Sequence, residues 1–138
     1  YQLAIAECYF RLSNYEQAIA EYEVLVEQYP DTRDVARAQF QIASSYALTE
    51  AYDKAIERYE TLLQSDTLSQ QIVADTKLEL AYCYTQNEQF TKALELYEEL
   101  LKLESASVSI DSELIKRKRE QVLKRIEESN RKPGKVKW

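Results

Sequence analysis

The chain has 138 residues, which fits one domain or a short array of repeats, and 45% of them are hydrophobic, as in folded soluble proteins. It contains one Gly, two Pro and no His. Because sheet-rich folds use Gly in many tight turns, this composition favours an all-α protein. His is the most common general base and metal ligand, so its absence predicts that the chain is not an enzyme and holds no metal or other cofactor.

The net charge of −6 is distributed unevenly along the chain. Residues 1–110 hold 8 Lys and Arg against 19 Asp and Glu, whereas residues 111–138 hold 10 against 5. The acidic body argues against nucleic acid as a partner of this part, because it would repel phosphate groups. No run of residues approaches the roughly 18–20 apolar residues of a membrane span.

Apolar residues recur at steps of three and four along the chain, which is the spacing of one face of an α-helix. The spacing predicts six helices, over residues 1–12, 15–28, 32–48, 52–65, 69–86 and 90–104. Asp31 or Thr32 is the expected N-cap of the third helix, and Ser69 is expected to begin the fifth.

The last part of the chain is predicted to be a polar linker over 105–109, a helix over 111–130 and a basic tail over 131–138. One side of this helix carries Ile115, Val122, Leu123 and Ile126. Its exposed surface is expected to carry the basic residues Lys116, Arg117, Lys118 and Arg119. The apolar side favours a cap on the preceding helices, and the alternative is that the basic residues contact an anionic partner.

Three segments of the chain repeat one pattern, an Ala with a Tyr nine residues before it and another four residues after it. The three sets are Tyr9, Ala18 and Tyr22; Tyr46, Ala55 and Tyr59; and Tyr84, Ala93 and Tyr97. A further Ala stands three residues before each first Tyr, at Ala6, Ala43 and Ala81, and a branched apolar residue precedes it, at Ile5, Ile42 and Leu80. Small residues let two helices approach closely, and each helix pair then leaves an apolar face that only a neighbouring pair can bury.

The alanines of this pattern are 37 and then 38 residues apart. The pattern resembles the tetratricopeptide repeat, a helix-turn-helix unit of about 34 residues. The resemblance implies an all-α, tetratricopeptide-type α-solenoid with repeats over 1–30, 31–68 and 69–106 and a capping helix over 111–130. The longer unit is similar to repeats of bacterial envelope proteins, such as the assembly lipoprotein of the Bam complex and the periplasmic coordinator of the Tol system. That similarity implies a location in the periplasm or on the periplasmic face of the outer membrane, with the cytoplasm as the alternative.

In the family that the chain resembles, the first helices of the pairs line a concave groove that binds a protein or peptide. The implied groove residues are Leu3, Glu7, Phe10 and Arg11 in the first repeat, Arg37, Phe40, Gln41 and Ser44 in the second, and Asp75, Leu78, Glu79, Tyr82 and Gln86 in the third. Leu3, Phe40 and Leu78 share one repeat position, so the alternative is that they belong to the core between helices. Some members of the family bind a C-terminal carboxylate through Lys and Asn side chains in the groove. The matching positions of this chain carry neither residue; they hold Leu3, Glu7, Phe40, Ser44, Leu78 and Tyr82.

These observations predict a protein-binding scaffold, with a structural spacer or oligomerisation segment as the alternative. Cys8 and Cys83 share the repeat position of Ser45, which predicts a small packing site between helices. Two repeats separate the two cysteines, so their Cα atoms are expected to lie beyond the limit of about 7 Å for a disulfide. We therefore predict that both thiols are free.

Overall fold

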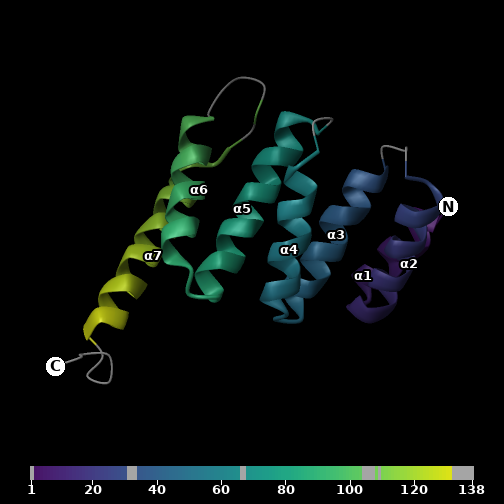
Figure 1. The fold of residues 1–138 in the computed structure, drawn as a ribbon, viewed down its shortest axis with the longest axis horizontal. Coiled ribbons are helices and arrows are strands. Elements are labelled where there is room, and N and C mark those ends of the chain that lie inside the picture. The colour runs from purple at the N-terminus through teal and green to yellow at the C-terminus, as the bar shows by residue number, and fades with distance from the viewer. Residues whose placement is uncertain (1, 31–33, 66–67, 104–107, 109, 132–138) are drawn as a thin grey trace. The chain divides into compact units, whose positions relative to one another are not determined.

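The computed structural model describes residues 2–30, 34–65, 68–103, 108 and 110–131. These residues form seven α-helices, labelled in Figure 1: α1 (Gln2–Arg11), α2 (Tyr15–Gln28), α3 (Asp34–Leu48), α4 (Tyr52–Leu63), α5 (Gln70–Gln86), α6 (Phe90–Lys102) and α7 (Ser112–Arg131). All seven predicted helices are present. The proposed caps Asp31 and Thr32, most of the linker and the tail beyond Arg131 lie outside the described residues.

The chain divides into two compact units, residues 1–69 and 70–138. In the first unit α1 packs on α2, α2 on α3 and α3 on α4. The alanines of the repeat are fully buried there, and Tyr22, Leu25 and Ile42 complete a core between the helices. The repeat pattern therefore predicted the residues at which these helices approach one another.

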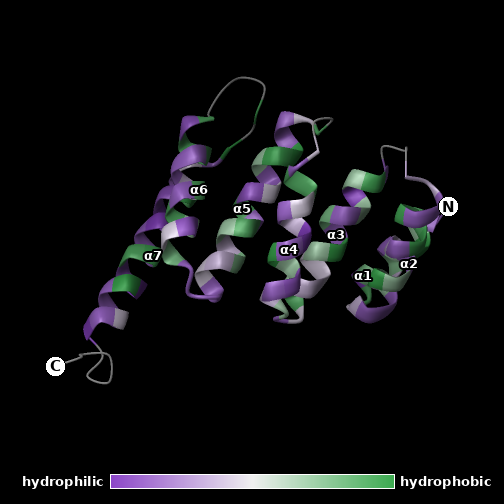
Figure 2. Ribbon diagram, viewed as in Figure 1, coloured by the Kyte–Doolittle hydropathy of each residue, from purple (hydrophilic) through white to green (hydrophobic). Residues whose placement is uncertain are grey.

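In the second unit α6 packs on both α5 and α7. Ala81, Ala93 and Tyr97 are buried, and α7 contributes Ile115 and Val122 to the interior. Figure 2 shows that the rest of α7 is mainly hydrophilic. None of the described helices is long and apolar enough to cross a membrane.

Two expectations for the last helix were wrong. Leu123 is 47% exposed, because the buried line of α7 runs through Ile115 and Val122, and the next residue is turned away from it. Lys118 and Arg119 are half-buried instead of exposed, since α7 presents them to α5 and α6. At the start of this helix, Oδ1 of Asp111 accepts a hydrogen bond from the backbone N–H of Leu114 at 3.1 Å, so Asp111 caps the helix.

The corner inside each helix pair has the same backbone form. Ser13, Glu50 and Glu88 have φ of 61°, 64° and 60°, which is the left-handed region that favours Gly. In the first corner the N–H of Asn14 donates to the carbonyl of Tyr9 at 2.9 Å, and the other two corners repeat this bond. This is the bond of a Schellman ending, and two of the three corners place Glu at its left-handed position.

The first helix departs from the expected packing. Ile42 and Ser45 on α3 are fully buried, because α2 packs on α3. Their counterparts on α1, Ile5 and Cys8, are exposed, and no described helix precedes α1 to cover them. The predicted packing site thus holds for Cys83, which is buried, and is wrong for Cys8. Both cysteines are free, as predicted.

Candidate functional site

Eight of the predicted groove residues lie on α1 and α3 of the first unit, and we call them the α1/α3 face: Leu3, Glu7, Phe10, Arg11, Arg37, Phe40, Gln41 and Ser44. Leu3 and Phe10 are half-buried against the core, and the Phe10 ring packs edge-on against Tyr15 at 5.4 Å between centroids. Phe40 packs in the same way against Tyr59 at 5.6 Å. The apolar members of the face therefore contribute to the core while part of each remains exposed.

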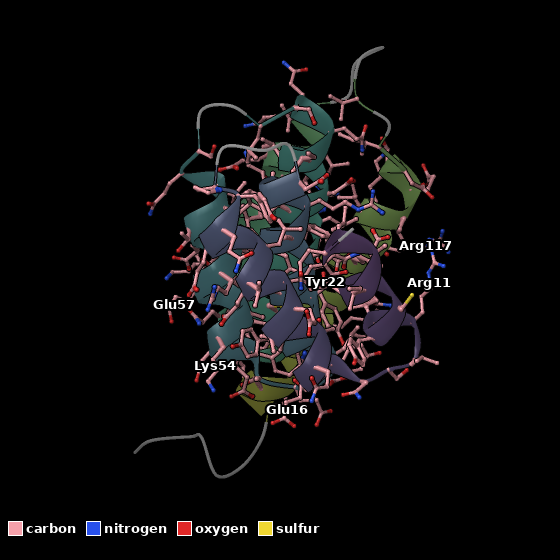
Figure 3. The ribbon with its side chains drawn as sticks, turned by 90° about the vertical axis from the view of Figure 1, so that its right-hand side faces the viewer. Arg11, Glu16, Tyr22, Lys54, Glu57 and Arg117 are labelled. Carbon is pink, nitrogen blue, oxygen red and sulfur yellow. The ribbon has the colours of Figure 1, made fainter. Side chains whose placement is uncertain are left out.

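Charged residues occupy the same face. Nη2 of Arg37 lies 2.8 Å from Oε1 of Glu7, so an ion pair joins α3 to α1. Arg11 is exposed, and it makes no ion pair within the described residues. In Figure 3 Arg11 points away from the helices on the side opposite to Lys54 and Glu57 of α4.

Tyr22 of α2 lies in the interior of the first unit, between these two sides in Figure 3. Its side chain is fully buried, and its hydroxyl has no hydrogen-bond partner. Burial raises the pKa of Tyr22 to about 12; the carboxylate of Glu7 adds to this rise, whereas Arg37 and Arg11 oppose it. A buried polar group without a partner costs about 1–3 kcal/mol.

The second repeat shows how the same position is satisfied. The hydroxyls of Tyr59 and Ser44 are 2.8 Å apart and share a hydrogen bond. Tyr59 and Ser44 stand 37 residues after Tyr22 and Glu7, so the two pairs are equivalent in the repeat. Oε1 of Glu7, like the Tyr22 hydroxyl, is buried without a hydrogen bond, since its contact with Arg37 is a charge contact without hydrogen-bond alignment.

The remaining predicted groove residues lie on α5 of the second unit, and all of them meet α7 or the segment that leads into it. Asp75 and Leu78 line a small pocket with Ile110 and Leu114. The Nζ of Lys118 lies over the ring of Tyr82, 5.6 Å from its centroid. Burial raises the pKa of Glu79, and Lys118 opposes that rise.

Arg125 is the residue of this region that sequence reasoning missed. Its Nη1 donates to the backbone carbonyl of Thr85 at 3.1 Å and to Oε1 of Gln86 at 3.0 Å, and its guanidinium lies 5.3 Å from the centroid of the Phe90 ring. Arg125 follows Lys118 by seven residues, so both stand on one side of α7. That spacing was the available signal. Arg125 lies outside the run of four basic residues at 116–119, so the run alone does not indicate it.

The predicted basic patch is divided between several neighbours. Lys116 lies 3.9 Å from Glu113, and Nε of Arg117 donates to the carbonyl of the same residue at 3.5 Å. Lys118 faces Tyr82, and Arg119 lies 3.9 Å from Glu98 of α6. The patch therefore presents a weaker basic surface than the run of residues suggests. The described residues contain no group of His, Cys, Asp and Glu suited to a metal ion.

Two family models match the chain, and both are described as tetratricopeptide repeat. One matches residues 1–67 and the other residues 41–107. No curated protein matches the sequence. Among solved structures, the tetratricopeptide domain of Sgt2 from Aspergillus fumigatus is similar, with a TM-score of 0.72, 21% identity, and coverage of 95% of this chain and 80% of that chain. A complex of the TPR2AB domain of yeast Sti1 with pHSP90 is also similar, with a TM-score of 0.73 and 14% identity over 94% of this chain and 47% of that chain.

Proposed function

Since the chain belongs to the tetratricopeptide repeat family, whose members generally mediate contacts between proteins, we propose that it is a scaffold that binds a protein or peptide segment on the α1/α3 face. The observation that carries the proposal is the combination of half-buried aromatic rings with exposed guanidinium groups on two neighbouring helices. Apolar anchors beside a few charges suit an extended or helical segment of a partner. The pHSP90 complex of a similar fold supports this mode of binding.

The predicted groove residues on α5 are less accessible to a partner than those of the α1/α3 face. Lys118 and Arg125 of α7 contact Tyr82 and Gln86, so α7 already engages two of the five predicted groove residues of α5. A partner would have to displace these contacts or bind beside them. We therefore assign the main contact to the first unit.

Capture of a partner from cell lysate tests the proposal. We expect the native chain to retain a partner that Phe40→Glu loses, because a charge on the face would have to be desolvated in the complex. Phe90→Glu is the matched control, since Phe90 is also a half-buried Phe and lies outside the α1/α3 face. Loss of the partner from both variants, or from neither, would remove this face from consideration, provided that both variants unfold at similar temperatures.

The repeat spacing of 37 and 38 residues also supports membership of the long-repeat subtype found in bacterial envelope proteins. Fractionation of the source cells tests this assignment. Recovery with the envelope fraction would agree with it, and recovery with the cytosol would contradict it.

A further inference from the structure

We propose that the α1/α3 face binds an acidic side chain of its partner at Arg37 and Arg11, and that Glu7 occupies this position until the partner arrives. This inference rests on the function proposed above and specifies the chemistry of the partner. It comes from two polar atoms of the first unit that are buried without a hydrogen bond.

Among the described residues only three buried side-chain atoms lack a hydrogen-bond partner, and two of them are the hydroxyl of Tyr22 and Oε1 of Glu7. One is a donor and the other an acceptor. In the next repeat the equivalent groups, on Tyr59 and Ser44, are 2.8 Å apart and bonded. The repeat geometry therefore places the base of the Glu7 side chain within reach of the Tyr22 hydroxyl.

Glu7 is held in a different direction by Arg37, whose Nη2 lies 2.8 Å from Oε1. The side chain of Arg37 is 61% exposed, so a second anion can approach the guanidinium from solvent. Arg11 stands one helical turn after Glu7 on α1, and it is exposed without an ion pair in the described part of the chain. The three residues together carry one net positive charge, although residues 1–110 as a whole are acidic.

Binding then proceeds as an exchange of partners. A carboxylate from the ligand pairs with Arg37 and accepts two parallel hydrogen bonds from its guanidinium group. Glu7 turns inward and accepts a hydrogen bond from Tyr22. The ligand–Arg37 pair replaces the Glu7–Arg37 pair, and Glu7 exchanges its counterion for a hydrogen bond from the Tyr22 hydroxyl. A Lys or Arg of the ligand would instead be repelled by Arg37 and Arg11. The rings of Phe10 and Phe40 supply apolar contacts for the residues that flank the acidic group.

The test uses three pools of synthetic hexapeptides with a fixed central Glu, Gln or Lys and mixed apolar residues around it. Every peptide is acetylated and amidated, so that no terminal carboxylate contributes. We expect the full chain to bind the Glu pool about fivefold more tightly than the Gln pool, the gain of a moderate ion pair. Arg37→Gln should abolish this preference, whereas Lys54→Gln on the opposite side should leave it unchanged.

The Glu7→Gln variant tests whether Glu7 competes with the ligand carboxylate for Arg37. Gln keeps an acceptor for Tyr22 but removes the charge that competes for Arg37, so binding of the Glu pool should become tighter. Strongest binding of the Lys pool, or weaker binding of the Glu pool after Glu7→Gln, would make Glu7 itself the recognition group and overturn the inference, while the proposed function would stand. A Glu preference that survives Arg37→Gln would overturn it as well. If no pool binds and no partner is captured by the native chain, the proposed function fails together with the inference.

Discussion

Three tyrosines show what a single repeat position determines and what it leaves open. Tyr22, Tyr59 and Tyr97 are all buried, as the recurring pattern around the alanines predicts. Their hydroxyls have different surroundings: Tyr59 shares a hydrogen bond with Ser44, whereas Tyr22 has no partner. The difference arises because Glu stands in the first repeat where Ser stands in the second, and the longer side chain reaches Arg37 instead.

Removing one hydroxyl at a time measures this difference. We expect Tyr59→Phe to lower the free energy of unfolding by about 1 kcal/mol, because a hydrogen bond is lost while the contact with the Phe40 ring is kept. Tyr22→Phe should leave the stability unchanged or raise it, since the lost hydroxyl is buried without a partner. Urea unfolding of the two variants gives the comparison. A larger loss for Tyr22→Phe would show that its hydroxyl is bonded in solution.

Buried acids of high pKa make the fold sensitive to alkali. Burial raises the pKa of the Cys83 thiol from 9.0 to about 12, and the pKa of Tyr97 from 10.0 to about 12. Because the folded state holds these protons more tightly, their contribution is complete below the unfolded pKa and is lost as the pH rises toward the folded value. We expect ionisation of the Cys83 thiol in the unfolded state to lower the free energy of unfolding by about 1.4 kcal/mol for each pH unit above 9. Between pH 8 and 10, the free energy of unfolding of Cys83→Ala should start below that of the native chain and fall less steeply with pH. Equal slopes for the two proteins would contradict the raised pKa of Cys83.

At the scale of the helix, the sequence predicted which segments are helical and roughly where each one ends. The reason is that each segment repeats an apolar face at helical spacing and stops at a corner of common form. The residues used at those corners were predicted less well. The left-handed positions are Ser13, Glu50 and Glu88, and two of them carry Glu, which is not a typical residue at positive φ. A Schellman ending imposes this conformation through its backbone bonds, whatever side chain is present.

These left-handed residues offer a test of the corner geometry. We expect Glu50→Gly to raise the free energy of unfolding by about 0.5–1 kcal/mol, because Gly has no Cβ to strain at positive φ. Glu57→Gly is the matched control in the exposed interior of α4, where Gly should lower stability by about 1 kcal/mol. Destabilisation by both substitutions would contradict the assigned backbone of the corner.

Residues at the same position of the repeat differ in burial between the first repeat and the second. Ile5 and Cys8 follow the same pattern as Ile42 and Ser45, yet they are exposed. A repeat pattern predicts which face of each helix is apolar, but it does not predict whether another helix covers that face. The same limit applied to α7, where the run of basic residues was predicted but its contacts with Tyr82 and Glu98 were not.

At the scale of the whole molecule, the sequence was sufficient for the tetratricopeptide fold and for placing candidate binding residues on the first helices of the pairs. The structure adds that the two units treat these residues differently. On the α1/α3 face an ion pair and two half-buried rings remain accessible to solvent in part. On α5 the side chains of Tyr82 and Gln86 are already in contact with α7. Contacts between residues about 40 positions apart depend on how the helices pack, and no local pattern in the sequence encodes them.

Photocrosslinking in cells tests whether the α1/α3 face binds a protein partner. One variant carries a photoreactive amino acid at Gln41 of that face, and a matched variant carries it at the exposed Glu57, which lies on the side opposite to Arg11 in Figure 3. After irradiation in the source cells, we predict a discrete crosslinked product from position 41 and none from position 57. The same products from both positions, or a product from position 57 alone, would contradict the account.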